Sequence, residues 1–209
     1  MTLTVSPDIF IGTKPNINRR KLLCGVGVND APYSTRVEIN GKEFRCPYYE
    51  KWGNLISRCY REPRRAKDKC YEGCSVSDDW LYFSNFRSWM ETQDWEDKHL
   101  DKDILFPGNK VYSPETCIFV PYHINQIIKP HTKRGKYPKG VLYNKITKRY
   151  NIQFRIKGKM YSRGGWDTPE EAYVEYKKIK YAELIKEANQ ITDEKLKNAL
   201  YNYAKILYD

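Results

Sequence analysis

The sequence predicts an α+β fold, because strand and helix periodicities occupy different parts of the chain. Residues 150–156 alternate apolar and polar side chains, as a half-buried strand does, whereas residues 47–60 repeat apolar side chains at helical spacing. The 209 residues are 40% apolar, which is enough to build a core. No segment reaches the roughly 20 apolar residues that a membrane span needs, so no membrane partner is expected.

Positive charge is concentrated in one part of the sequence. The chain carries 37 Lys and Arg residues against 26 Asp and Glu residues, a formal net charge of +11. No acidic residue occurs between Thr116 and Trp166, which favours a polyanion as partner over a merely solvated basic face. The basic residues of this acid-free segment are Lys129, Lys133, Arg134, Lys136, Lys139, Lys145, Lys148, Arg149, Arg155, Lys157, Lys159 and Arg163.

The first twenty residues contain no compact apolar stretch of the kind that forms a secretory signal, and they include Asp8, Lys14, Arg19 and Arg20. We therefore expect a cytoplasmic protein. Residues 91–103 (ETQDWEDKHLDKD) are rich in carboxylates, which suits either a divalent cation or a solvated acidic surface.

The first part of the chain combines irregular segments with a hairpin and a helix. Residues 1–34 are expected to be irregular, with one short strand at Leu22–Val28. The dipeptide Asn40-Gly41 favours a type I′ turn, which predicts a hairpin over residues 35–45. Pro47 then begins a helix that extends to Tyr60.

A second helix is predicted to open at Ser84. Its apolar stripe is most simply part of the core, and the alternative is an aromatic platform on which nucleic-acid bases stack. The stripe consists of Phe83, Phe86, Trp89 and Met90.

Residues 100–128 predict the order strand, loop, strand, helix. The strands are expected at Leu100–Leu105 and Cys117–Val120, on either side of a loop centred on Gly108-Asn109, and the helix begins near Tyr122. Residues 129–139 are basic and interrupted by Pro and Gly, so we expect a linker there.

Three strands and two helices are predicted after the linker. The strands lie at Gly140–Asn144, Tyr150–Lys157 and Lys159–Gly164. Thr168-Pro169-Glu170-Glu171 is a strong helix start with a capping box, and a last helix covers Asp193–Leu207. On the polar side of the sheet we expect base-reading residues flanked by phosphate-binding residues. The predicted DNA-binding residues are Lys148, Arg149, Asn151, Gln153, Arg155, Lys157, Lys159 and Arg163.

This C-terminal part resembles the AP2 domain of plant transcription factors and phage endonucleases. The resemblance implies a three-stranded antiparallel sheet plus helix that binds double-stranded DNA. The matching residues are Gly140-Val141, Tyr150 to Ile156, Gly158-Lys159, Gly165-Trp166, Asp167-Thr168 and Glu170 to Tyr173.

The segment LDKDILFPGNKVYSPETCIFVPYHIN resembles the ββα-metal (HNH) motif of phage endonucleases. By this resemblance, Asp101 and Asn125 match the ligands of a catalytic Mg²⁺ or Mn²⁺ ion. Asn109 lies near the loop asparagine, and Glu115 belongs to the turn before the second strand. The cation would stabilise charge on the scissile phosphate, while a base activates water.

The position of the general base departs from this family, since Lys102 stands where the family has histidine. Asp103 and His123 are the candidate catalytic residues in its place. The sequence thus predicts a DNA-binding, metal-dependent endonuclease-like phage protein in the cytoplasm of the host bacterial cell. The alternatives are a catalytically degenerate HNH-fold regulator that binds DNA, and a protein-binding inhibitor of a host defence system.

The expected domains are an irregular segment (1–34), an HNH-like domain with its preceding hairpin and helices (35–128), the linker (129–139) and an AP2-like domain with a C-terminal helix (140–209). The six cysteines lack paired CxxC spacing. We expect reduced thiols rather than a structural zinc site, for which the candidate ligands are Cys46, Cys59, Cys70, Cys74 and Cys117.

Overall fold

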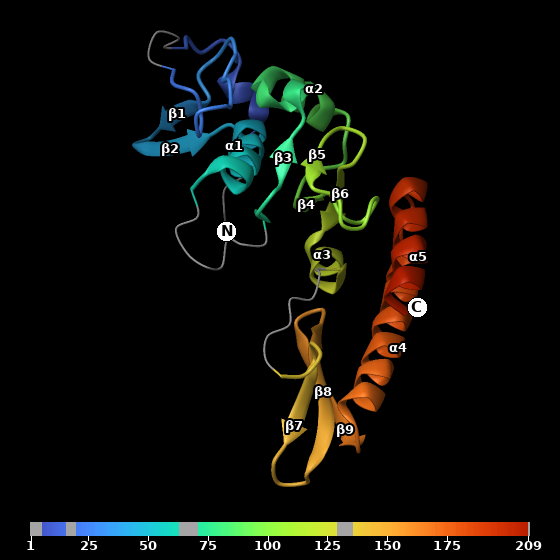
Figure 1. Cartoon of the computed structure of the whole chain (residues 1–209). Coiled ribbons are helices and arrows are strands. Elements are labelled where there is room, and N and C mark those ends of the chain that lie inside the picture. The colour runs from blue at the N-terminus through green and yellow to red at the C-terminus, as the bar shows by residue number, and fades with distance from the viewer. Residues whose placement is uncertain (1–5, 16–19, 63–70, 129–135, 209) are drawn as a thin grey trace. The chain divides into compact units, whose positions relative to one another are not determined.

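The structure is a computed structural model that describes residues 6–15, 20–62, 71–128 and 136–208 (Figure 1). The chain forms two compact units. Unit 1 comprises Met1–Asp94 and Gly108–Cys117, and unit 2 comprises Trp95–Pro107 and Ile118–Asp209. Helices are mixed with small, mostly antiparallel sheets, which confirms the α+β class.

The units differ from the expected domain boundaries. The predicted strand–loop–strand–helix segment is divided between them, because its loop belongs to unit 1 and its strands and helix belong to unit 2. Most of the expected linker, residues 129–135, lies outside the described residues. None of the helices in the described part of the chain is long and apolar enough to cross a bilayer.

The predicted hairpin of unit 1 is confirmed. Strands β1 (Arg36–Ile39) and β2 (Lys42–Arg45) pair in antiparallel fashion. Asn40 and Gly41 both have positive φ angles, 51° and 74°, as a type I′ turn requires. The local turn signal was therefore sufficient to place this element.

An aromatic core holds unit 1 together. Helices α1 (Pro47–Tyr60) and α2 (Phe83–Glu91) bury Trp52, Phe83 and Phe86 completely. Three of the four stripe residues, Phe83, Phe86 and Met90, are therefore core residues, and Trp89 is partly exposed. The helix begins one residue before Ser84, whose N–H donates to the Asp30 carboxylate at 2.8 Å.

Two expectations for unit 1 are wrong. No strand forms at Leu22–Val28, where only isolated bridges join Leu23 to Gly27 and Val28 to Tyr82. The loop after Gly108 contains a strand, β5 (Val111–Tyr112), that pairs in parallel with β3 (Ser75–Val76). Short 3-10 helices η1 (Pro7–Phe10) and η4 (Asp78–Leu81) complete this unit.

In unit 2, strand β4 (Lys98–Asp101) pairs in antiparallel fashion with β6 (Ile118–Pro121), and α3 (Tyr122–Ile128) follows. The first strand was expected to run to Leu105. It ends at Asp101 because the Asp101 carboxylate accepts the N–H groups of Asp103 and Ile104, which turns the chain.

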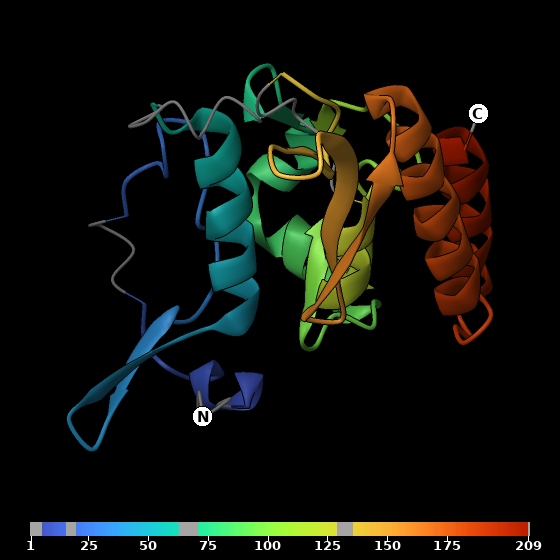
Figure 2. The ribbon, with the colours of Figure 1, turned by 90° about the horizontal axis from the view of Figure 1, so that it is seen from below.

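The C-terminal elements of unit 2 agree with the predicted ones. Strands β7 (Val141–Asn144), β8 (Arg149–Ile156) and β9 (Lys159–Trp166) form one antiparallel sheet in sequence order. Helix α4 (Pro169–Ala188) begins with the predicted capping box, and α5 (Glu194–Tyr208) packs beside it (Figures 1 and 2).

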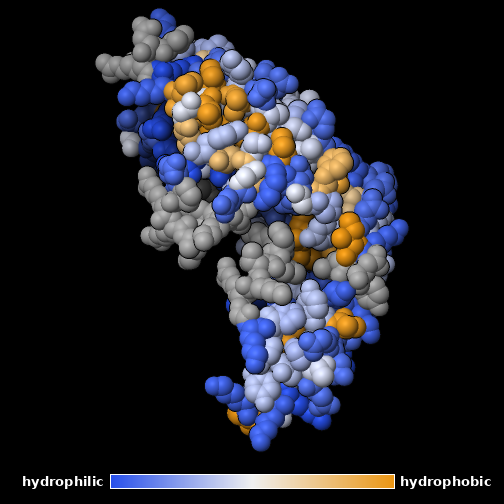
Figure 3. Space-filling view, in the orientation of Figure 1, coloured by the Kyte–Doolittle hydropathy of each residue, from blue (hydrophilic) through white to orange (hydrophobic). Residues whose placement is uncertain are grey.

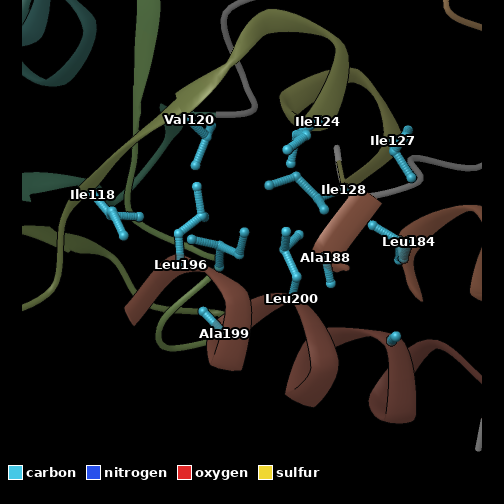
Figure 4. Close-up of a cluster of buried hydrophobic side chains, with 12 residues drawn as sticks. Ile118, Val120, Ile124, Ile127, Ile128, Leu184, Ala188, Leu196, Ala199 and Leu200 are labelled. Carbon is cyan, nitrogen blue, oxygen red and sulfur yellow. The ribbon is translucent and has the colours of Figure 1, made fainter. Parts of the chain in front are cut away.

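Two apolar clusters stabilise unit 2. The larger one joins β6 and α3 to α4 and α5, with Val120, Ile124, Leu184 and Leu200 essentially buried (Figure 4). The smaller one packs β7 and β8 against the first half of α4 through Val141, Ile152, Ala172 and Tyr176. Helix α4 therefore packs against both the β4–β6–α3 segment and the three-stranded sheet.

Candidate nucleic-acid interface

The β7–β8–β9 sheet has one face against α4 and one face exposed. Directly paired residues lie on the same face of a sheet. Ile152 is paired with Val141 and Arg163 and is buried on the α4 side. The neighbouring residue Asn151, paired with Leu142 and Gly164, is therefore on the opposite side, which we call the open face.

No strand residue of the open face is acidic; Arg149, two residues before Asn151 on the same face, pairs with Asp167, which directly follows β9. Gln153 and Arg155 lie on the open face and are exposed, as the sequence predicted. Their partners on β9 are Ser162 and Met160, and Met160 is 53% exposed. Figure 3 shows that the surface over these strands is mostly hydrophilic. The open face thus combines hydrogen-bonding side chains with a few exposed apolar ones, and proteins use both kinds of side chain to recognise base edges in the major groove.

Gly164 leaves room for the Asn151 side chain on this face. A Cβ atom at Gly164 would collide with the Asn151 side-chain amide, which lies directly over the Gly164 backbone. Only glycine at position 164 therefore leaves room for this amide, which is half-buried.

Arg163 does not lie on the open face. The two-residue turn Lys157-Gly158 fixes the register of β8 and β9 and places Arg163 opposite Ile152, on the α4 side. Its guanidinium is 3.4 Å from the Glu175 carboxylate of α4. Lys159, opposite Ile156, therefore also lies on the α4 side and is exposed at the start of β9.

Lys157 is also not part of the open face. It occupies the turn with a positive φ of 47°, and its ammonium is 2.7 Å from the Glu187 carboxylate. This contact raises the pKa of Lys157. Arg149 is 3.2 Å from Asp167, whereas Lys148 is exposed in the β7–β8 loop. Of the eight predicted DNA-binding residues, Gln153 and Arg155 on the open face are thus best placed to contact a duplex.

The carboxylates at the end of β4 have internal partners. Burial raises the pKa of Asp101, and hydrogen bonds from the Ile104 and Asp103 N–H groups oppose that rise. The side chain of Lys102, only 8% exposed, is 2.6 Å from the Asp103 carboxylate. The Asp103 carboxylate is thus occupied by the Lys102 ammonium, which leaves it less available to bind a metal ion or to accept a proton from water. Burial, together with the charges of both carboxylates, raises the pKa of Tyr203 to about 12.

His123 is paired with Glu187, 64 residues further along the chain. The His123 Nε2 atom is 2.8 Å from Glu187 Oε2, and the Glu187 side chain is 4% exposed. Burial alone would raise the pKa of Glu187, but hydrogen bonds from Lys157 and His123 outweigh it and lower the pKa. Asn125 lies on α3 and is partly exposed.

Asn109 and Glu115 make hydrogen bonds within the loop between β4 and β6. The Asn109 side-chain amide donates to the Val111 carbonyl at 2.6 Å and accepts the Val111 N–H at 3.0 Å. Ser113 Oγ donates to the Glu115 carboxylate at 2.6 Å. Both residues thus stabilise this loop.

The thiols do not form disulfides in the described residues. Cys24, Cys46, Cys59, Cys74 and Cys117 are free, and Cys70 lies outside those residues. The same part of the chain contains no group of three or more His, Cys, Asp or Glu side chains placed to hold a metal ion. The proposed metal ligands Asp101 and Asn125 fall outside such groups, because Asn125 would bind a metal ion through its side-chain amide.

Sequence reasoning missed two buried charged residues of α4, Glu187 and Lys180. Lys180 is 4% exposed, and its ammonium donates to the Ile127 carbonyl at 3.3 Å. Burial and the nearby Lys139 lower its pKa to about 8, against the opposing effect of Glu183. Charged residues in an amphipathic helix usually mark its solvent side, so spacing alone gave no signal for either position.

We expect Lys180→Met to raise the free energy of unfolding by about 1–3 kcal/mol at neutral pH, because methionine fills the site without a buried charge. The pKa of Lys180 is about 8 in the folded state and 10.5 ordinarily. The free energy of unfolding of the wild type should therefore rise as pH increases from about 8 towards 10.5. In that window the unfolded chain still holds the proton and the folded chain has lost it.

Urea unfolding at several pH values measures this effect, with Lys178→Met on the same helix as the control for an exposed lysine. The Lys180→Met variant should lack the gain with pH. An equal gain in wild type and variant would contradict the assignment.

Comparisons with known proteins found no family model, no curated protein and no solved structure that matches this chain.

Proposed function

We propose that this protein binds double-stranded DNA through the open face of the β7–β8–β9 sheet. The observation that carries the proposal is the exposure of Gln153 and Arg155 on strands that contain no acidic residue, within the acid-free segment. A small antiparallel sheet fits the major groove, where arginine pairs with guanine and glutamine with adenine.

The surroundings of the open face support the same partner. The exposed residues Lys145 and Lys148 lie in the β7–β8 loop, at one end of the open face. Cations at the end of a reading face are placed to contact phosphates, which supply most of the affinity for DNA.

Arg155→Ala is expected to weaken binding to a preferred duplex about tenfold to a hundredfold, because one bidentate base contact is worth about 1–3 kcal/mol. Arg163→Ala is the matched control, since it removes the same charge from the α4 side of the same sheet. It should change affinity by less than about threefold. Fluorescence anisotropy with labelled duplex measures both, and equal losses would contradict readout by the open face.

Metal-dependent hydrolysis of DNA is a second candidate function. It is favoured by the order β4, loop, β6, α3, with Asp101 at the end of β4 and Asn125 on α3. Those two residues would hold Mg²⁺ or Mn²⁺, which stabilises charge on the scissile phosphate, and His123 is the better candidate base. We rank hydrolysis second because Asp101 caps a turn and Lys102 neutralises Asp103.

Nicking of supercoiled plasmid in Mg²⁺ or Mn²⁺ tests this second function. Nicking should be lost in Asn125→Ala and retained in Gln126→Ala, a neighbouring substitution on the same short helix. Duplex binding without nicking would support a non-catalytic DNA-binding regulator. Nicking that survives Asn125→Ala would exclude this residue as an essential metal ligand.

A further inference from the structure

The β1–β2 hairpin is a two-stranded sheet that extends away from α1 (Figures 1 and 2). Within the described residues, neither strand pairs with a third one. Sheets usually need three or more strands, or a covering helix, for independent stability. An unpaired strand edge also offers a row of N–H and C=O groups to another chain.

The outer edge of β2 is open to such pairing. Cys46 N–H donates to the Thr35 carbonyl at 2.9 Å, so these two residues form a hydrogen-bonded pair. Hydrogen-bonded and non-hydrogen-bonded pairs alternate along the hairpin, which points the backbone N–H and C=O groups of Glu43 and Arg45 outwards. No described residue hydrogen-bonds to these outward groups.

The edge of β1 is less available. The Ser34 hydroxyl donates to the Arg36 carbonyl at 2.5 Å and also accepts the Arg36 N–H at 3.4 Å. Both outward backbone groups of Arg36 are therefore already engaged, which makes β2 the edge to consider.

The charges on β2 are complementary to themselves. Glu43 and Arg45 have opposite charge and are two residues apart on one side of the strand, with Phe44 between them on the other side. If two β2 strands pair in antiparallel fashion about Phe44, each Glu43 faces the Arg45 of the other copy. Opposite charges in directly facing positions stabilise a strand pair.

We propose that two copies of this chain dimerise through β2, pairing about Phe44 to form a four-stranded sheet. Phe44 of one copy lies beside Phe44 of the other, next to Val37 on each β1, which extends the apolar side of the hairpin. Glu43 is now 3.6 Å from Arg36 and 3.3 Å from Arg45 of its own chain, but these pairs are more than half exposed and therefore weak. They are readily exchanged for contacts with the second copy.

A second copy fits this edge better than DNA does. Glu38 and Glu43 face each other on the hairpin and would repel phosphates, whereas in the dimer Glu43 gains a cationic partner. The dimer does not depend on DNA binding, so the proposal and the proposed function can fail separately.

Two charge reversals test the pairing. Glu43→Arg leaves two arginines at the contact positions, and Arg45→Glu leaves two glutamates, so each variant faces like charges in its own dimer. Sedimentation velocity should show wild-type protein shifting with concentration from one chain of 24.9 kDa towards two. Each variant alone should associate about tenfold more weakly. An equimolar mixture should recover the wild-type association, because the arginine introduced into one copy then faces the glutamate introduced into the other.

A disulfide trap supplies an independent measurement. A non-hydrogen-bonded antiparallel pair brings Cα atoms within about 4.5 Å, a separation that a disulfide spans. Phe44→Cys should therefore cross-link under mild oxidation, while Ile39→Cys and wild type, with its native thiols, should not. The proposal is overturned if wild type stays monomeric and Phe44→Cys gives no dimer, if the mixture fails to recover association, or if Ile39→Cys links equally well.

Discussion

Replacing Gly140 by alanine is expected to lower the free energy of unfolding of unit 2 by about 3–4 kcal/mol. Gly140 has a φ of +81°, where an alanine costs about 1–2 kcal/mol. A Cβ atom there would also lie 2.5 Å from Cε2 of Tyr176, a ring that is 1% exposed. Because Tyr176 packs edge-to-face on Phe154 at 5.1 Å, the ring has little room to yield.

Gly158→Ala separates the two causes. Gly158 has nearly the same φ, +80°, but no atom beyond its two chain neighbours lies within 4 Å of the position of its Cβ. This control should lose only about 1–2 kcal/mol in urea or thermal unfolding. Equal losses at the two positions would mean that the contact with Tyr176 has no energetic weight.

Replacing Glu187 by glutamine should cost about 2–3 kcal/mol of stability. Glu187 is buried in α4 and pairs with both His123 of α3 and Lys157 of the β8–β9 turn. The variant keeps the shape of the side chain but leaves both partners without their counter-charge, and broken buried pairs are costly. Since Lys157 and His123 are themselves partly exposed, the loss should stay below that of a fully buried pair.

The pH dependence identifies this carboxylate. The pKa of Glu187 is lowered from its ordinary value of 4.5, so its contribution is complete above about that pH and is lost as pH falls through the pKa of the folded state. Unfolding measured across this range should show a smaller acid loss for Glu187→Gln than for wild type. Glu183→Gln, on the preceding turn of the same helix, should behave like wild type.

Local signals predicted the parts of the fold that depend on neighbours in sequence. Asn40-Gly41 gave the hairpin turn, and Thr168 with Glu171 gave the start of α4. Capping and turn geometry involve only four or five residues, so they can be recognised without the tertiary structure.

The candidate site was harder to predict because its contacts are distant in sequence. Nothing near His123 indicates a partner 64 residues away, and nothing near Asp101 shows that its carboxylate is used to end a strand. The side of the sheet on which Arg163 lies depends on register, since a shift of one residue would move it to the open face. A two-residue turn at Lys157-Gly158 sets that register, and Lys157 is an unusual residue for a positive φ.

The affinity of the wild-type protein for a labelled duplex, measured against salt concentration, tests the central claim most directly. Our account predicts binding at low salt and a linear fall of log affinity with log salt, with a slope of about −3.5 to −5.5 for roughly four to six phosphate contacts. Absence of binding to any duplex at low salt would contradict it and favour a protein partner instead.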